Sequence, residues 1–365
     1  MKNVLVLAND YRIILNFRAE LIRGLVGEGF NVAVALPPDE NNALIEQLGC
    51  EVIDLKMSRR GTNPLADCKT LFAIIKILHR FKPACVLTFT IKPNVYGGIA
   101  CSLLRIPYIA SITGLGTSLE NQGLTKRISL FLYKLGLRKA ANVFFQNTYN
   151  LQFMQNNKVY NGAYTLIPGS GVNLTKFTYH PLPQEDTLRF IFVGRVMKDK
   201  GINEFLAAAE IIKRKYPNTS FNIYGAYEDD YHEVLTKYQQ AGIITYHGLV
   251  SNMAEVYQSC HCLIHPSYHE GMANVLLEAA ATGRAIIASN IPGCQEAINN
   301  GVNGYVFKVK DVASLSEAIE KFIRLATEEK VLMGKAGHQL MEERFDRRKV
   351  IAKYIDCVKD ITQSN

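Results

Sequence analysis

The strongest constraint in this sequence is an alternation of short, continuous apolar runs with longer amphipathic stretches, because it restricts the chain to layered α/β folds. In the first half the apolar runs lie at residues 4–8, 32–36, 52–55, 86–90, 108–113 and 143–146. Stretches with helical periodicity, such as residues 17–27 and 65–80, lie between them. Continuous apolar strands separated by helices predict a parallel sheet covered on both faces.

The alternation pauses at residues 167–187, which carry two glycines and three prolines in the manner of a linker. It restarts with runs at residues 188–194, 220–224, 243–246, 262–265, 285–288 and 304–307. We therefore expect two doubly wound, Rossmann-like domains facing a cleft. The first spans residues 1–170 and is joined by a C-terminal helix at about 346–365, and the second spans 171–345. Ligands on such sheets bind beyond the carboxyl ends of strands.

The composition excludes several classes of protein. With 365 residues, 48% hydrophobic and 20% charged, the chain is typical of a globular protein with more than one core. No stretch approaches the roughly 18–20 apolar residues of a membrane span, and the first ten residues indicate a buried strand and not a secretory signal. The net charge of +8 fits phosphorylated substrates, anionic lipid or nucleic acid, although no nucleic-acid recognition element is present.

The eight cysteines are scattered, which is typical of buried thiols in a reducing cytoplasm. Only Cys260 and Cys262 are close together, and they flank His261. This trio lacks the second ligand pair that a structural zinc site requires, so buried thiols are favoured over zinc.

The first chemical motif, residues 194–201, follows an apolar run and precedes an amphipathic stretch. Gly194 lets the backbone approach a ligand, Arg195 offers a planar fork for phosphate oxygens, and Lys200 offers a mobile charge. The position after a strand favours a phosphate site over the alternative, a solvated basic turn.

The second motif, residues 265–279, contains two glutamates around a turn. A strand is expected to end near His265 and a helix to start near Ala273, where free N–H groups would bind a diphosphate. Glu270 lies in the loop between them, and Glu278 lies on the helix. A carboxylate in so apolar a helix needs a partner, and a ribose diol would supply two hydroxyl donors. For each glutamate alone, a structural salt bridge is the alternative.

Arg195, Lys200, and Glu270 separated by seven residues from Glu278 resemble the signature of the retaining family 4 glycosyltransferases, which have the GT-B fold. Residues 270–293 are similar to that family along their whole length. The resemblance implies an α/β protein whose first domain binds an acceptor and whose second domain binds a nucleotide sugar.

The resemblance also implies roles for single residues. Arg195 and Lys200 would hold the donor diphosphate, Glu270 the transferred sugar and Glu278 the ribose. The other donor-binding positions would be Gly194, Gly225, Leu249, Val250, Gly271, Met272, Ala273, Asn274 and Val275. No cofactor and no divalent metal are expected, because cationic side chains and a helix N-terminus take the place of the metal. The acidic pair at residues 229–230 is interpreted as a solvated helix start.

Loops after the strands of the first half are expected to bind the acceptor. The candidate residues are Arg12, Arg18, Arg59, Arg60, Lys92, Asn94, Thr113 and Gly114. The arginines could bind an acceptor phosphate or be surface residues without a role, and Lys92 could offset charge on the leaving diphosphate. The segment after the first strand lacks the glycine-rich turn of a dinucleotide site. Segments 9–18, 88–98 and 113–117 resemble transferases that build O-antigen, capsule or N-glycan precursors on polyprenyl-diphosphate carriers.

Residues 124–140 carry five basic residues and no acid, with apolar residues at helical spacing. Such a helix is typical of a surface that binds anionic lipid, and the alternative is a domain helix that packs its apolar stripe inward. The acceptor class favours lipid. We therefore expect a cytoplasmic protein bound peripherally to the inner face of the plasma membrane.

The function that these observations predict is transfer of a hexose or N-acetylhexosamine from a UDP-sugar to a polyprenyl-diphosphate-linked saccharide. N-acetylgalactosamine is the first candidate for the sugar, and uridine for the nucleotide, both by resemblance. Two alternatives remain. A GT-B-shaped sugar-nucleotide epimerase would bind similar donors without an acceptor. A two-domain sugar-binding module would not need the phosphate-binding residues.

Overall fold

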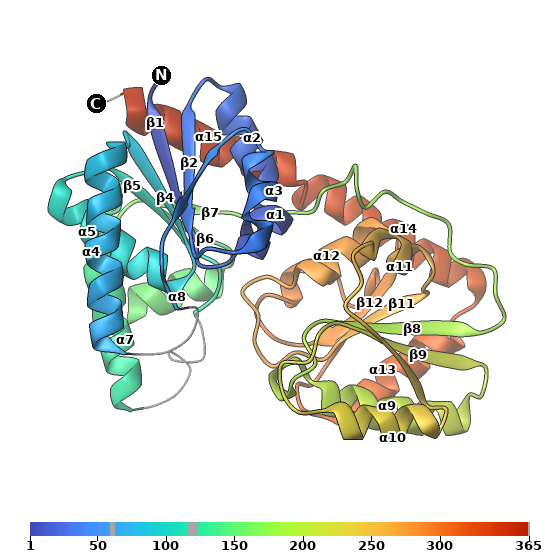
Figure 1. Ribbon diagram of the computed structural model, residues 1–365. Coiled ribbons are helices and arrows are strands. Elements are labelled where there is room, and N and C mark those ends of the chain that lie inside the picture. Colours follow the sequence, from blue (N-terminus) through green and yellow to red (C-terminus); the bar gives the residue numbers. More distant parts are fainter. Residues whose placement is uncertain (59–62, 116–122, 364–365) are drawn as a thin grey trace. The chain divides into compact units, whose positions relative to one another are not determined.

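The computed structural model describes residues 1–58, 63–115 and 123–363, which form two units (Figure 1). Unit 1 consists of Met1–Ser170 and Arg348–Asn365, and unit 2 of Gly171–Arg347. The C-terminal segment therefore returns to the unit that the N-terminal half begins.

Unit 1 is built on a seven-stranded parallel sheet with the order β3-β2-β1-β4-β5-β6-β7. Its strands are β1 (Asn3–Leu7), β2 (Asn31–Leu36), β3 (Glu51–Asp54), β4 (Cys85–Phe89), β5 (Tyr108–Ile112), β6 (Asn142–Phe145) and β7 (Tyr164–Leu166). In β1, Val4 and Val6 face one layer of helices while Leu5 and Leu7 face the other. Both sets are buried, which is why the strands are apolar without alternation.

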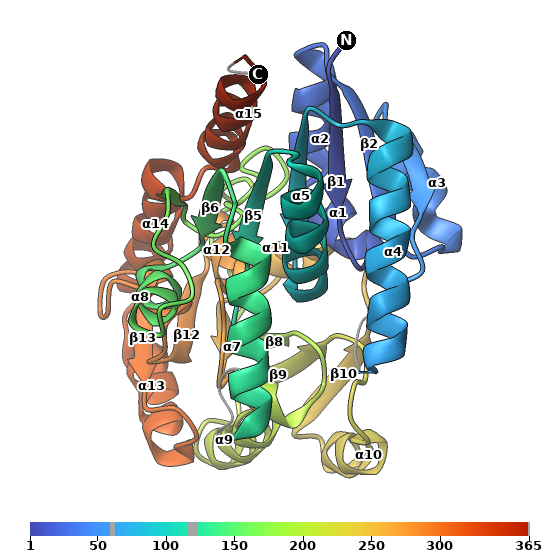
Figure 2. The same ribbon diagram turned by 90° about the vertical axis from the view of Figure 1, so that its left-hand side faces the viewer.

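Helices cover both faces of the unit 1 sheet. They are α1 (Tyr11–Phe17), α2 (Ala19–Gly27), α3 (Ala43–Glu46), α4 (Pro64–Phe81), α5 (Gly98–Leu104), α7 (Leu124–Leu137), α8 (Thr148–Asn156) and α15 (Arg347–Gln363). The helices α1, α2 and α15 pack on the face that Val4 and Val6 present. On the other side lie α4, α5 and α7, which stand in front of the sheet in Figure 2. A π-helical turn, η2 (Pro93–Gly97), precedes α5.

The helix α15 completes the core of unit 1. Its Tyr354 ring stacks on Phe144 with centroids 4.0 Å apart, and its hydroxyl hydrogen-bonds with Ser111 Oγ at 2.9 Å. Val350 and Val358, one turn to either side, are also buried against this face.

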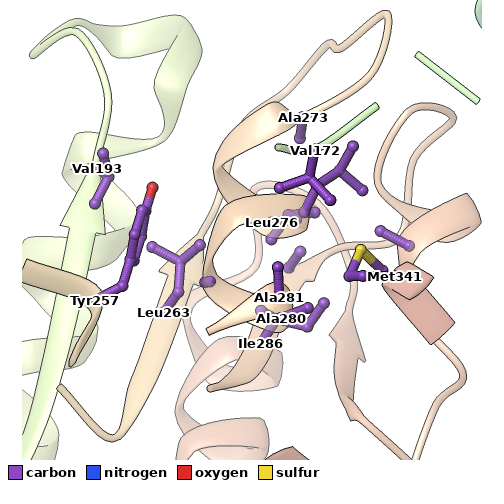
Figure 3. Close-up of a cluster of buried hydrophobic side chains, with 14 of the residues drawn as sticks. Val172, Val193, Tyr257, Leu263, Ala273, Leu276, Ala280, Ala281, Ile286 and Met341 are labelled. Atoms are coloured by element: carbon purple, nitrogen blue, oxygen red, sulfur yellow. The ribbon is translucent and has the colours of Figure 1, made fainter. Parts of the chain in front are cut away.

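Unit 2 repeats the plan with six parallel strands in the order β10-β9-β8-β11-β12-β13. The strands are β8 (Leu188–Val193), β9 (Thr219–Tyr224), β10 (Ile244–Gly248), β11 (Cys262–His265), β12 (Ala285–Ser289) and β13 (Gly304–Phe307). The helices are α9 (Ile202–Lys215), α10 (His232–Gln240), α11 (Met253–Gln258), α12 (Asn274–Ala281), α13 (Val312–Arg324) and α14 (Thr327–Arg344). Figure 3 shows the core beneath α12, in which Leu276 and Ala280 pack with Leu263, Ile286 and Met341.

The α/β class with two parallel sheets is confirmed, two local expectations are wrong, and one strand was missed. The helix expected at residues 17–27 begins at Ala19, because Phe17 ends α1 and Arg18 leaves helical geometry (φ −129°, ψ −2°). The strand β7 lies just before the linker and was not expected. The acidic pair at 229–230 does not start a helix, since α10 begins at His232 and Asp229 accepts a hydrogen bond from the Lys198 N–H.

Each sheet has one point where the strand order reverses. In unit 1 it lies between β1 and β4, and in unit 2 between β8 and β11. The connections from the two central strands leave in opposite directions there, which opens a crevice beyond their carboxyl ends. A ligand is therefore expected to bind at the residues that follow these four strands.

Candidate active site

The two chemical motifs of unit 2 follow the two strands that flank its reversal point. Arg195 comes two residues after the end of β8, and the loop with Glu270 begins where β11 ends at His265. The two strands are paired, with Phe190 opposite Cys262. The fold thus brings together segments that are about 70 residues apart in the chain.

Close backbone packing fixes the loop after β11 against the turn that carries Lys200. Gly201 has φ +73°, and a Cβ atom on it would overlap the carbonyl oxygen of Pro266. The Tyr268 N–H donates to the Asp199 carbonyl at 2.9 Å. A left-handed glycine is needed here for both its φ and its lack of a side chain. The packing places Lys200 beside the loop.

Lys200, His265 and Glu270 form one charged cluster. Lys200 Nζ lies 2.5 Å from Glu270 Oε1, and His265 Nε2 lies 2.8 Å from the same oxygen. Burial alone would raise the pKa of Glu270. The Lys200 ammonium and the His265 hydrogen bond outweigh it and hold that pKa well below its usual range. Glu270 is therefore an anion with one oxygen fixed by two donors.

Glu278 has a different environment on α12. Tyr257, a fully buried residue of α11, donates its hydroxyl to Glu278 Oε2 at 3.0 Å. Burial raises the pKa of Glu278 to about 7, although the Tyr257 hydrogen bond and the charges of Arg347 and Lys176 act against it. In Figure 3 the Tyr257 ring stands beside Leu263 with its hydroxyl away from the apolar cluster. Glu278 is therefore a partly buried carboxyl group with one oxygen bound by Tyr257.

Arg195 lies outside the Lys200–Glu270 cluster. Its guanidinium is 3.4 Å from Glu228 and 40% exposed.

The glycines that follow β8 and β9 approach each other closely through their backbones. A Cβ atom on Gly225 (φ +147°) would overlap the Gly194 carbonyl oxygen. The Gly225 N–H in turn donates to the Gly248 carbonyl at 2.8 Å.

The remaining donor-binding candidates surround the same edge of the sheet. Leu249 is 82% exposed, whereas Val250 packs partly against the core. Met272 and Ala273 are buried. The Ala273 N–H donates to the Gly293 carbonyl at 2.9 Å, so that group is already used within the protein. Gly271 precedes them in the loop, and Asn274 and Val275 open α12, where the first N–H groups have no carbonyl of the helix to donate to.

Three buried polar atoms at this edge have no hydrogen-bond partner among the residues that the structure describes. They are His265 Nδ1, Asn274 Oδ1 and Ser289 Oγ. Buried polar atoms normally find a partner, so their grouping at the carboxyl ends of β11 and β12 and at the start of α12 is consistent with a ligand or ordered water. Sequence reasoning did not single out Tyr257, Ser289 or the His265–Glu270 bond.

The acceptor candidates of the first two strands differ in exposure. Arg12 is exposed and forms an ion pair with Asp10, the cap of α1, at 2.7 Å. Arg18 is 3% exposed, and its guanidinium lies 4.4 Å from the centre of the Phe89 ring. The alternative that Arg18 is a surface residue is therefore wrong. Arg59 and Arg60 lie outside the described residues.

The candidates that follow β4 and β5 are held by neighbours. Lys92 Nζ lies 2.7 Å from Asp67 and 2.9 Å from Ser58 Oγ. Asn94 is buried, accepts from Thr88 Oγ1 at 2.6 Å and donates to the Ser111 carbonyl at 2.8 Å. These bonds give Asn94 a structural role. Thr113 and Gly114 directly follow β5.

The helix α7 presents its basic, apolar face outward. Tyr133, Gly136 and Leu137 are buried, while Ile128 and Phe131 are 50% and 60% exposed. Of the apolar stripe, Leu132 packs partly against the core, whereas Ile128, Phe131 and Leu135 are exposed, so the alternative in which the stripe packs inward holds only for Leu132.

Both halves of the chain match models of glycosyltransferase families. Residues 3–147 match the family model "Glycosyl transferase 4-like" and residues 179–339 the model "Glycosyl transferases group 1". A Campylobacter jejuni relative, N,N'-diacetylbacillosaminyl-diphospho-undecaprenol alpha-1,3-N-acetylgalactosaminyltransferase, is 29% identical over 362 residues, which covers 94% of each chain. The Escherichia coli UDP-Gal:alpha-D-GlcNAc-diphosphoundecaprenol alpha-1,3-galactosyltransferase is 23% identical and covers 83% of this chain and 81% of its own.

Solved structures share the fold across both units. Anabaena HepE in complex with UDP and glucose superposes with a TM-score of 0.81 at 17% identity, covering 99% of this chain and 100% of its own. Sucrose-phosphate synthase from Thermosynechococcus elongatus gives 0.81 at 18% identity and covers all of both chains. With a family match in each half and this two-sheet fold, the chain belongs to the GT-B glycosyltransferases and is a glycosyltransferase.

Proposed function

We propose that this glycosyltransferase transfers a hexose or N-acetylhexosamine, with N-acetylgalactosamine as the first candidate, from a UDP-sugar to a lipid-diphosphate-linked saccharide. Such a reaction belongs to surface polysaccharide or glycan biosynthesis. The names of the Campylobacter and Escherichia coli relatives support the acceptor class, and the first of them supports the sugar. The observation that carries the donor assignment is the Lys200–Glu270 pair at the reversal point of unit 2, on the loop that leads into the helix carrying Glu278.

In this proposal, Lys200 and Arg195 offset the charge of the donor diphosphate, and Glu270 accepts hydrogen bonds from the transferred sugar. Glu278 accepts from the ribose hydroxyls. The bond between the anomeric carbon and the diphosphate oxygen breaks, and the acceptor oxygen bonds to that carbon with retention of configuration. The acceptor proton passes to the departing diphosphate. Fixed positive charge stabilises the leaving group, so the reaction needs no divalent metal.

The test is transfer from UDP-sugars to a synthetic polyprenyl-diphosphate disaccharide, in buffer containing EDTA. We expect the acceptor to gain the mass of one sugar and the new linkage to be α by NMR. Glu270→Gln, which keeps the shape of the loop, is the matched inactive control. A UDP-sugar that is converted without acceptor to an epimer still attached to UDP would establish the epimerase instead. If no UDP-sugar is bound or consumed, the donor assignment is wrong.

We further propose that unit 1 binds the inner face of the plasma membrane through α7. Leu124, Ile128, Phe131 and Leu135 form an exposed stripe along this helix, flanked by the basic residues Lys126, Arg127, Lys134, Arg138 and Lys139. On the same side of the sheet, α4 exposes Leu65 and Phe72 with Lys69 and Lys76. Apolar and basic groups together favour an anionic bilayer surface.

No helix among the described residues is long and apolar enough to cross a bilayer. The peripheral contact can be tested by flotation with vesicles. We expect binding to vesicles that contain phosphatidylglycerol and little binding to pure phosphatidylcholine. Exchanging Ile128 and Phe131 for glutamine should weaken binding by about tenfold or more, because insertion of apolar side chains is lost. Leu332→Gln, an equally exposed leucine on α14 of unit 2, is the control. Unchanged binding of the double variant contradicts the proposal.

A further inference from the structure

The reversal point of unit 1 carries two residues that the donor site does not explain. The strands β1 and β4 are the central pair, with Leu7 opposite Thr88 in parallel register. Asn9 follows β1 by two residues, and Thr90 follows β4 directly. Both therefore lie just beyond the carboxyl ends of neighbouring strands, where doubly wound sheets bind their ligands.

The side-chain oxygens of these residues are buried without a partner. Asn9 Oδ1 and Thr90 Oγ1 are inaccessible to solvent and have no hydrogen bond within the part of the chain that the structure describes. Their neighbours differ, because Thr88 Oγ1 donates to Asn94 and the Asp10 carboxylate binds Arg12. Unsatisfied oxygens on residues that follow two paired strands, at the edge where such sheets bind ligands, indicate that the partner comes from outside the protein.

The backbone at Thr90 gives a second, independent observation. Its φ of +76° lies in the left-handed region, which a β-branched residue rarely adopts. The Thr90 carbonyl accepts from the Asn94 N–H and begins the helical segment that contains the π-turn η2. A left-handed backbone at a residue other than glycine and a π-helical turn both occur preferentially at functional sites. The Thr90 hydroxyl does not accept from the helix N–H groups, as the hydroxyl of a capping threonine would.

The chemistry of the pair selects its ligand. The Asn9 amide oxygen only accepts hydrogen bonds, and the Thr90 hydroxyl can accept or donate one. A phosphate oxygen offers no donor, whereas a sugar hydroxyl or an acetamido N–H does. The nearby cation Lys92 is occupied by Asp67 and Ser58. Because the Asn9 oxygen needs a donor that a phosphate oxygen lacks, the pair suits a neutral, hydroxyl-bearing sugar ring better than a diphosphate.

We propose that Asn9 and Thr90 form a sugar-binding subsite of unit 1 that holds the acceptor saccharide by its hydroxyl or acetamido groups. This inference rests on the proposed transferase function and adds two residues that select the substrate. Glycine would fit the backbone at φ +76° better than threonine does, but it would not supply the hydroxyl.

The test compares Asn9→Ala and Thr90→Gly with the wild type in the transfer assay, together with the melting temperature and the UDP-induced thermal shift. We expect kcat/KM for the acceptor to fall at least tenfold in each variant, with the UDP shift unchanged. The melting temperature of Thr90→Gly should equal or exceed that of the wild type, because its backbone is relieved. If the role of Thr90 were only structural, Thr90→Gly would lose no activity as long as it is as stable as the wild type.

Asn142→Ala is the matched control. Asn142 Oδ1 is also buried without a partner, but the residue opens β6 at the amino edge of the same sheet and its amide nitrogen donates to Thr165. We expect this variant to transfer at the wild-type rate below its melting temperature.

A second arm identifies the sugar that the pair binds. A raised KM for the acceptor, with normal hydrolysis of UDP-sugar in its absence, supports the acceptor saccharide. Reduced hydrolysis without acceptor would assign the pair to the transferred sugar instead and overturn the acceptor assignment. Wild-type kinetics in both variants would overturn the subsite altogether. Failure of the wild type to use any UDP-sugar would reject the proposed function itself. This result differs from the outcomes above, in which the wild type is active and only the variants change.

Discussion

Replacing Lys200 by methionine is expected to lower the rate of transfer by about a thousandfold, because a fixed charge beside the leaving diphosphate is lost. The same change should destabilise the protein by about 2–4 kcal/mol, since the buried Glu270 carboxylate loses its ammonium partner. In the wild type, the depressed pKa of Glu270 contributes stability at neutral pH that is lost as the pH falls below the unfolded value of 4.5. Urea unfolding and initial rates measure the two effects separately.

A double variant separates charge burial from catalysis. Lys200→Met with Glu270→Gln removes both charges and keeps an acceptor for the His265 N–H. We expect most of the stability to return and none of the activity. Lys215→Met is the control, because it breaks an exposed ion pair between α9 and Glu320 of α13. This variant should change stability by less than about 0.5 kcal/mol. Full activity in the double variant would exclude Lys200 and Glu270 from the donor site.

Glu278→Gln is expected to make the protein more stable at pH 8 while weakening its binding of UDP. The pKa of Glu278 is about 7 in the folded chain and 4.5 in the unfolded chain. The folded state therefore binds the proton more tightly, and the wild type loses stability as the pH rises from 4.5 to 7. The glutamine variant keeps the Tyr257 hydrogen bond without this loss, so its advantage should reach about 1–3 kcal/mol above pH 7.

Unfolding at pH 4, 6 and 8, with and without UDP, measures this effect. The two proteins should have nearly equal stability at pH 4, where the carboxyl is protonated in both states. The UDP-induced stabilisation should be smaller in the variant, because one ribose hydrogen bond is lost. Glu255→Gln, an exposed carboxylate on α11, is the control and should change neither quantity. Parallel pH curves for wild type and Glu278→Gln would contradict the raised pKa.

The sequence was sufficient to predict every strand except β7, the loops that carry Lys200 and Glu270, and the helix that carries Glu278, because apolar runs and glycine turns are local signals. It could not reveal how these side chains are paired. Tyr257 and Glu278 meet only because α11 and α12 pack on the same face of the sheet, and no periodicity in the sequence connects them.

Other features were hidden for the same physical reason. The Ala273 N–H is used by Gly293 through a loop contact between distant segments, and Arg18 is buried because α15 returns to cover it. Whether the oxygens of Asn9 and Thr90 have a hydrogen-bond partner depends on the positions of all the neighbouring donors, which the sequence does not give. A local signal existed only for Thr90, as a threonine that directly follows an apolar run and precedes a helix.

The return of α15 to the first unit has a consequence for how the chain folds during synthesis. Residues of α1, α2 and β1 leave the ribosome first, but the apolar face that they share stays uncovered until Val350, Tyr354 and Val358 have been made. Unit 2 has all its strands by then and can fold as a unit. The domain that is begun first is therefore finished last, and its uncovered face is a surface that chaperones would be expected to protect.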